Sequence, residues 1–164
     1  MSKSEKNLQD AFAGESQANR KYLAFAKKAE AEGYKQVAKL FRAAAAAETI
    51  HAHNHLRELG IVKSTMDNLR DAINGESYEF QKMYPMMIAD AQTEGNSNAL
   101  QSFTYANAVE KVHAALYQKA LENLGRNTDT DYYVCSVCGY TAEGEAPDEC
   151  PVCKSKKQAF HKVE

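Results

Sequence analysis

The sequence contains no tryptophan, only three prolines and no long apolar run. A membrane-spanning helix needs about 18 or more consecutive apolar residues, so the sequence excludes such a helix. The formal net charge is only −2, and interspersed acids and bases leave no basic face for a phosphate backbone. The first residues also lack the apolar segment of a signal peptide. We therefore expect a cytoplasmic protein that binds neither membrane nor nucleic acid.

Cysteine is missing from most of the chain, and all four cysteines lie near the C-terminal end as Cys135-x-x-Cys138 and Cys150-x-x-Cys153. Two such turns can present four thiolates to one tetrahedral metal ion. Two tight turns in a chain without a secretory signal do not favour disulfides. This short segment has few large apolar side chains, so the metal must also organise its fold. A structural zinc ribbon is the alternative to an iron site.

Proline is also absent from residues 4 to 32, which are rich in Ala, Lys, Glu and Gln and therefore favour one long helix that stops at Gly33. Similar patterns predict a second helix to Gly60, a third that starts at Ser64 or Thr65, and a fourth that runs from the 94–96 turn to residue 125. Pro85 should kink the third helix near Glu79. The fold class is mainly α, with a helical bundle over residues 1–125, a linker at 126–131 and a metal-binding segment at 132–164.

Acidic residues interrupt the apolar face of each predicted helix. A carboxylate and an imidazole three residues apart share one helix face, and this spacing occurs twice, as Glu48/His51 and Glu110/His113. Glu15 lies on the apolar stripe of the first helix. In the third helix Glu76 and Glu79 lie on or beside the inner face, so the second half of the chain has one extra carboxylate.

These inward carboxylates need compensating positive charge, because an unpaired buried carboxylate costs several kcal/mol. Facing residues of an antiparallel hairpin lie equally far from the turn. This test pairs Glu15 with Glu48 across Gly33, and Glu76 or Glu79 with Glu110. Two metal ions would supply the charge, and a glutamate plus Glu-x-x-His from each hairpin resembles the ligand set of di-iron carboxylate bundles.

The motifs resemble those of the rubrerythrin family along essentially the whole chain. They are Phe-Ala-Gly-Glu15-Ser-Gln-Ala, Glu48-x-x-His51, Gly75-Glu76-x-x-Glu79, Met83-Tyr84-Pro85, Glu110-x-x-His113 and the cysteine-rich, rubredoxin-like tail. The resemblance implies a ferritin-like four-helix bundle followed by a small rubredoxin-like domain. The connection after Gly60 is short, which leaves open whether partner chains exchange helices.

The resemblance also implies a role for each site residue. Glu48 and Glu110 would bridge two irons, Glu15 and Glu79 would bind the first iron, and Glu76 and His113 the second. The first iron would exchange Glu79 for His51 when its oxidation state changes. Tyr22 and Tyr84 match family tyrosines that donate hydrogen bonds to ligating glutamates.

The implied activity is the reduction of hydrogen peroxide to water in oxidative stress defence. Its cofactors would be a non-haem di-iron centre and one iron held by the four cysteines. An NAD(P)H-dependent reductase or a rubredoxin would supply electrons. A ferritin-like protein that oxidises and stores iron is the alternative, and a zinc-ribbon interaction protein is a third reading that leaves the inward acids unexplained.

The distance from the tail to the bundle site predicts a dimer. Glu110 and His113 lie more than ten residues before Gly125, so at 1.5 Å per residue the tail would leave the bundle about 20 Å from the site. A six-residue polar linker should not readily fold the tail back along the bundle. A second, antiparallel chain would bring its tail beside the irons of the first, and the family resemblance implies such a head-to-tail homodimer, so we expect electrons to pass from the tail of one chain to the bundle of the other.

Overall fold

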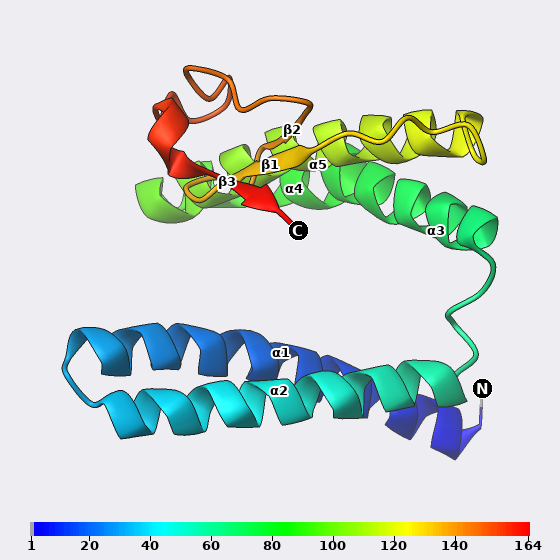
Figure 1. Ribbon diagram of the computed structural model, residues 1–164, viewed down its shortest axis with the longest axis vertical. Helices are drawn as coiled ribbons and strands as arrows, with labels where there is room; N and C mark the ends of the chain where they lie inside the picture. The colour runs from blue at the N-terminus through cyan, green and yellow to red at the C-terminus, as the bar shows by residue number, and fades with distance from the viewer. Residues whose placement is uncertain (1) are drawn as a thin grey trace. The chain divides into compact units, whose positions relative to one another are not determined.

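The computed structural model describes residues 2–164, which separate into two compact units between Lys63 and Ser64. The first unit contains two antiparallel helices, α1 (Lys3–Ala31) and α2 (Lys35–Glu58) (Figure 1). The second unit contains a helical hairpin and the cysteine-rich tail. The mainly α fold class is therefore confirmed.

The start of α1 and the turn after it follow from local sequence. Ser2 accepts a hydrogen bond from the Glu5 backbone N–H at 3.1 Å, and the Glu5 carboxylate accepts one from the Ser2 N–H, which completes a capping box. Gly33 then adopts a φ of +86°, a conformation that glycine reaches without strain. Alanines such as Ala26 and Ala38 are buried between the two helices and allow a close approach. The predicted first hairpin is confirmed.

The second hairpin is formed by α3 (Thr65–Tyr78), the π-helical turn η1 (Glu79–Met83), α4 (Tyr84–Thr93) and α5 (Ser97–Glu122). Ser64 caps α3 and Asn96 caps α5, each through a side-chain oxygen that accepts a backbone N–H. A π-helical turn begins at Glu79 and ends two residues before Pro85, and the kink expected there stays a prediction. Proline suits this place because it lies in the first turn of α4 and has no N–H to donate.

The tail forms a three-stranded antiparallel sheet with the order β2-β1-β3, from β1 (Tyr132–Cys135), β2 (Thr141–Glu143) and β3 (Phe160–Val163). A short 3₁₀ helix, η2 (Lys157–Ala159), precedes β3. The tail is packed along α5, since Asn127 donates a hydrogen bond to the Ala120 carbonyl at 3.1 Å and Lys119 pairs with Glu143. The prediction that the linker would leave the tail at the end of the helix is therefore wrong. The extended chain after α5 turns back along the helix. Its contacts with α5 offset the conformational entropy that the linker loses when it becomes ordered.

The fully buried apolar side chains among the described residues are mainly small. They are alanines, Val109 and two cysteines, whereas the larger side chains of the helices keep much of their surface. In α1 and α2, for example, Phe25 is 47% exposed and Leu40 is 67% exposed. Over residues 2–164, no helix combines the length and apolar character that crossing a bilayer requires.

Candidate metal centres

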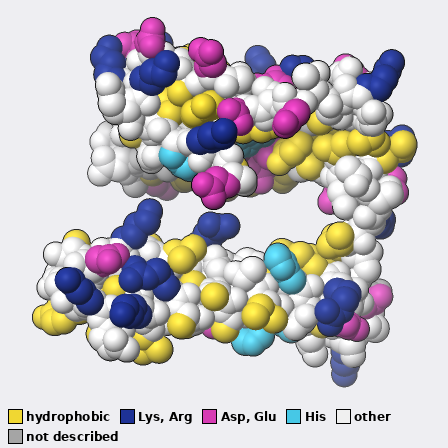
Figure 2. All heavy atoms as spheres, in the orientation of Figure 1, with side chains coloured by type: hydrophobic (Ala, Val, Ile, Leu, Met, Phe, Trp, Pro, Cys, Tyr) yellow, Lys and Arg dark blue, Asp and Glu magenta, His cyan; other side chains and the backbone are white. Residues whose placement is uncertain are grey.

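The α1–α2 hairpin brings Glu15, Glu48 and His51 together. One ligand atom from each of the three side chains lies within 4.8 Å of the others. The Nδ1 atom of His51 lies 2.8 Å from Oε2 of Glu48, as the three-residue spacing on one helix face predicts. The His51 side chain is 53% exposed, and Figure 2 shows histidine side chains at the surface of this hairpin.

The second hairpin brings Glu76, Glu110 and His113 together in the same way. The Nδ1 atom of His113 lies 2.8 Å from Oε2 of Glu110 and 3.6 Å from Oε1 of Glu76. This cluster is more enclosed than the first, since the His113 side chain is only 27% exposed. Both predicted pairings of a glutamate with Glu-x-x-His are thus present within their own hairpins.

The carboxylates of the second hairpin favour a cation. Burial, followed by the charge of Glu110, raises the pKa of Glu76. Burial, followed by the charge of Glu76, raises the pKa of Glu79. These shifts mean that negative charge is costly at this place, and a bound metal ion would remove the cost. The oxygen-rich donor set with an imidazole suits iron.

Glu79 is near the second cluster but is not a member of it. It lies at the first position of the π-helical turn, where the Tyr84 N–H donates to the Glu79 carbonyl oxygen. A π-helical turn adds one residue to a helix and frequently occurs at functional sites. Tyr84 follows Glu76 by eight residues, whereas Tyr22 follows Glu15 by seven. The extra residue in the turn accounts for that difference.

The two tyrosines have aromatic surroundings. Tyr22 contacts the rings of Phe25 and Phe41, and Tyr84 contacts the ring of Phe103. Burial, followed by the charges of nearby glutamates led by Glu110, raises the pKa of Tyr84. Within residues 2–164 neither phenol makes a hydrogen bond to a glutamate, so that role remains a prediction.

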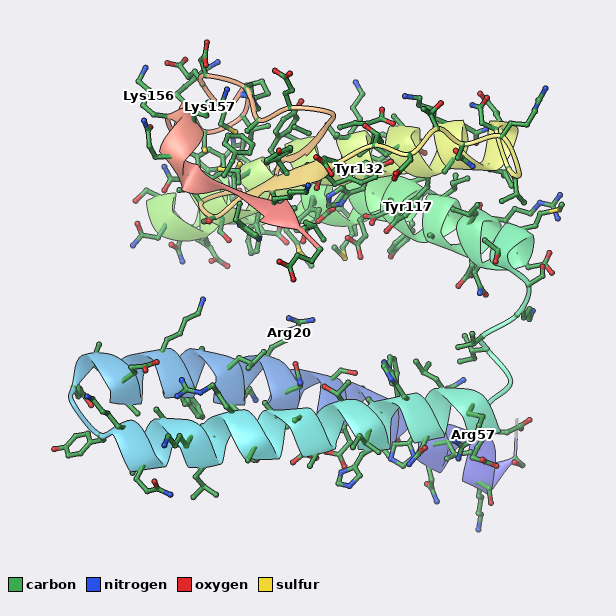
Figure 3. All side chains as sticks on the ribbon, in the orientation of Figure 1. Arg20, Arg57, Tyr117, Tyr132, Lys156 and Lys157 are labelled. Carbon is green, nitrogen blue, oxygen red and sulfur yellow. The ribbon has the colours of Figure 1, made fainter. Side chains whose placement is uncertain are left out.

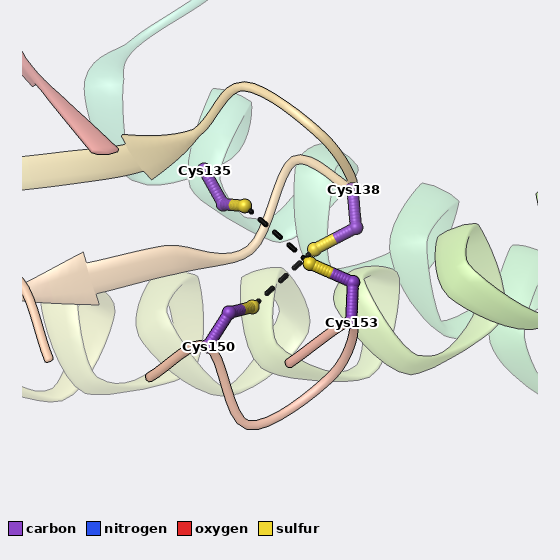
Figure 4. Close-up of side chains that lie close together, drawn as sticks. All are labelled: Cys135, Cys138, Cys150 and Cys153. Atoms are coloured by element: carbon purple, nitrogen blue, oxygen red, sulfur yellow. Dashed lines mark hydrogen bonds between the residues drawn. The ribbon is translucent and has the colours of Figure 1, made fainter. Parts of the chain in front are cut away.

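The four cysteines form the third candidate centre (Figure 4). All four are free thiols, with Cys135 and Cys150 buried. Their sulfur atoms lie 3.6 Å apart for Cys135 and Cys153, and 3.5 Å apart for Cys138 and Cys150. Sulfur atoms bonded to one tetrahedral ion at about 2.3 Å would lie roughly 3.8 Å apart, so the cluster fits a metal with little movement. We call this cluster the four-cysteine site.

The thiols differ in how readily they lose a proton. Burial raises the pKa of Cys138. Burial also acts to raise the pKa of Cys153, but hydrogen bonds with Ser155, Cys138 and Cys150 together outweigh it and lower the pKa to about 6. Cys153 therefore offers a thiolate at neutral pH, and a metal must displace the proton of Cys138.

One contact that the sequence did not indicate joins the tail to the second hairpin. The Nε2 atom of His113 lies 2.9 Å from Oγ1 of Thr141 on β2. Gly139, which follows Cys138, lies close to Val109 of α5. A single threonine carries no signal of such a role in the sequence, because only the packing of the tail along α5 brings it to the histidine.

Comparison with family models then tests the resemblance. Residues 6–121 match the rubrerythrin family, and residues 133–161 match the rubredoxin-like domain of rubrerythrin. The chain belongs to the rubrerythrin family. The resemblance on which the predicted fold and cofactors rested is therefore confirmed.

Several proteins are similar to this member of the rubrerythrin family. Nigerythrin of Nitratidesulfovibrio vulgaris is 42% identical over 168 residues, covering 94% of this chain and 83% of nigerythrin. Rubrerythrin-2 of Clostridium acetobutylicum is 37% identical, over 93% of this chain and 92% of its own length. The solved structure of fully reduced, all-ferrous nigerythrin covers 99% of this chain and 88% of its own, with 38% identity and a TM-score of 0.61.

Proteins of the rubrerythrin family are generally oxidoreductases that contain a di-iron site and a rubredoxin-like iron site with four cysteines, and they use redox partners. The donor sets described above fit these groups in number and chemistry. Oxygen-rich ligands with one histidine in each hairpin suit the higher oxidation states of iron, and four thiolates suit a one-electron iron site. The predicted cofactors are therefore confirmed.

Proposed function

We propose that the chain is a peroxidase that reduces hydrogen peroxide to water. Two irons can each supply one electron, and the reaction takes up two electrons and two protons to form two waters. The observation that carries the proposal is the hydrogen bond between His113 and Thr141, because it couples a candidate iron ligand to the cysteine-rich tail. A storage protein has no need for that coupling.

The carboxylates and histidines of both hairpins would hold the irons. The family resemblance implies that Glu48 and Glu110 would bridge the irons, and each of them lies 2.8 Å from the histidine of its own Glu-x-x-His pair. The terminal ligands would be Glu15 and Glu79 on one iron and Glu76 and His113 on the other, with His51 replacing Glu79 when the first iron is reduced.

The four thiolates of Cys135, Cys138, Cys150 and Cys153 would hold the iron that receives electrons from outside. Its donor would be an NAD(P)H-dependent reductase or a rubredoxin. We retain the head-to-tail homodimer as a prediction from the family resemblance and the cytoplasmic location as a prediction from the sequence. The geometric argument for electron transfer between chains no longer supports the dimer, since the tail is packed along α5 of its own chain.

The test is anaerobic purification with metal analysis, followed by titration of the reduced protein with hydrogen peroxide. We expect three irons per chain, a red ferric four-cysteine site, and one peroxide consumed for every two bundle irons oxidised. With a coupled reductant, turnover should continue and should be lost in Cys138→Ser. Zinc in both sites would remove the redox function, and accumulation of many irons per chain under oxygen would identify a storage protein instead.

A further inference from the structure

The Thr141 hydroxyl that contacts His113 also contacts the turn that carries Cys138. The Oγ1 atom of Thr141 lies 3.3 Å from the carbonyl oxygen of Gly139, to which it donates its proton. With its proton directed to Gly139, that hydroxyl offers lone pairs to His113, and we infer that the Nε2–H of the imidazole is the donor at 2.9 Å. The chain of donors therefore has one direction, from His113 through Thr141 to Gly139.

This direction fixes which nitrogen of His113 is free to bind metal. With the proton on Nε2, the Nδ1 atom has its lone pair available, and Nδ1 is the atom that faces Glu110 and Glu76. Ligating histidines usually donate their other ring N–H to a neighbouring acceptor, which sets the tautomer and the ring orientation. Thr141 provides that acceptor for this histidine.

The surroundings of the hydrogen bond strengthen it. A cavity of about 360 Å³ adjoins His113 and Thr141, and its other lining residues are Leu69, Leu116, Tyr117, Ala120 and Tyr132. Tyr117 on α5 and Tyr132 at the start of β1 are labelled in Figure 3. In such mainly apolar surroundings a polar contact is stronger than in water, and losing one partner is more costly.

His51 of the first hairpin has no counterpart of Thr141. Its Nδ1 atom faces Glu48, but in the described part of the chain no partner is found for its Nε2 atom. The two histidines occupy equivalent positions of equivalent motifs, so the tail distinguishes them. A hydrogen bond with Thr141 orients His113, and within residues 2–164 no such bond orients His51.

We propose that Thr141 is a positioning residue for the dinuclear centre. Its hydroxyl holds His113 as the Nε2–H tautomer. Its hydrogen bond to the carbonyl of Gly139, the residue after Cys138, connects that ligand to the turn of the four-cysteine site within a single chain. This inference rests on the proposed function for its use in electron transfer. Each electron that passes oxidises the iron of the four-cysteine site from ferrous to ferric and reduces one ferric ion of the dinuclear centre to ferrous. The external reductase then restores the ferrous iron of the four-cysteine site.

The test compares Thr141→Val, which removes the hydroxyl at nearly constant shape, with Thr141→Ser, which keeps it. Valine is favoured in strands such as β2, so the fold should survive, and Thr141→Ala repeats the test with a smaller side chain. The first measurement uses the full chain loaded with zinc in all sites. In ¹⁵N-resolved NMR we expect a slowly exchanging His113 Nε2–H in the wild type and in Thr141→Ser, and exchange faster by about tenfold or more in the valine variant.

The second measurement uses the iron-loaded chain. After reduction of the four-cysteine site alone, the return of its ferric absorption reports the passage of the electron to the dinuclear centre. We expect this rate to fall about tenfold or more in Thr141→Val and to recover in Thr141→Ser. Unchanged exchange of the His113 Nε2–H in Thr141→Val would overturn the proposal, as would equal losses in the valine and serine variants. The NMR result does not depend on peroxide chemistry, so failure of the peroxidase function would be seen separately.

Discussion

The two helical hairpins carry the same motif, but their surroundings differ. The α1–α2 hairpin holds Glu15, Glu48 and an exposed His51 on uninterrupted helices. The α3–α5 hairpin has a π-helical turn and a more enclosed His113 that contacts the tail. The comparison teaches that one ligand pattern can occur in two different surroundings, since the histidine of the second hairpin contacts the tail. The difference comes from what packs around the pattern.

Removing either proposed bridge tests whether the hairpins contribute equally. We expect Glu48→Ala and Glu110→Ala each to abolish the dinuclear centre, because a bridge neutralises both ions and its loss leaves the other acids in mutual repulsion. The loss of iron affinity should exceed the roughly 100-fold that outer residues cause. Iron analysis after gel filtration measures it, with the exposed Glu58→Ala and Glu122→Ala as matched controls. Two irons retained in the bundle of either variant would contradict the bridging assignment.

Disrupting the four-cysteine site should affect only one hairpin. In Cys138→Ser the tail loses its metal and with it most of its folding free energy, because the segment has little apolar core. Amide hydrogen exchange should then rise in β1, β2 and the side of α5 near His113, while α1 and α2 keep their wild-type protection. Equal loss of protection in both hairpins would show that the tail supports the whole chain.

The extra carboxylate should matter for reactivity more than for assembly. We expect Glu79→Ala to retain two bundle irons but to be oxidised by peroxide about tenfold more slowly, because the oxidised first iron loses its incoming ligand. Stopped-flow oxidation of the reduced variant measures the rate, and Glu94→Ala at the exposed end of α4 is the control. Oxidation at the wild-type rate would remove the exchange of Glu79 with His51.

The smallest expected effect is the pH dependence of the metal-free chain. Burial and then Glu110 raise the pKa of Glu76 above its ordinary value of 4.5, so the folded state favours the protonated carboxyl. Its contribution to stability is therefore complete below pH 4.5 and is lost as the pH rises through the raised pKa. We expect Glu76→Gln to reduce this loss and shift the melting temperature near neutral pH by a few degrees. The exposed Glu122→Gln should leave the pH profile unchanged, and a wild-type profile in Glu76→Gln would refute the assignment.

Local chemistry in the sequence determined much of the fold and of the candidate site. Helix ends follow from Ser2, Gly33, Ser64 and Asn96, whose capping bonds or backbone angles act over one turn. The pairing of each glutamate with its Glu-x-x-His follows from equal distances to a short turn. The cysteine cluster follows from two Cys-x-x-Cys turns whose spacing suits one tetrahedral metal ion.

Tertiary structure decided which candidate ligand contacts the tail. The linker after α5 could have extended from the helix end or turned back along it, and its polar sequence favours neither. The contacts of Asn127 with Ala120, of Glu143 with Lys119 and of Thr141 with His113 together select the second course. These residues are more than six positions apart, so no local pattern links them, and only the folded chain brings Thr141 to a metal ligand.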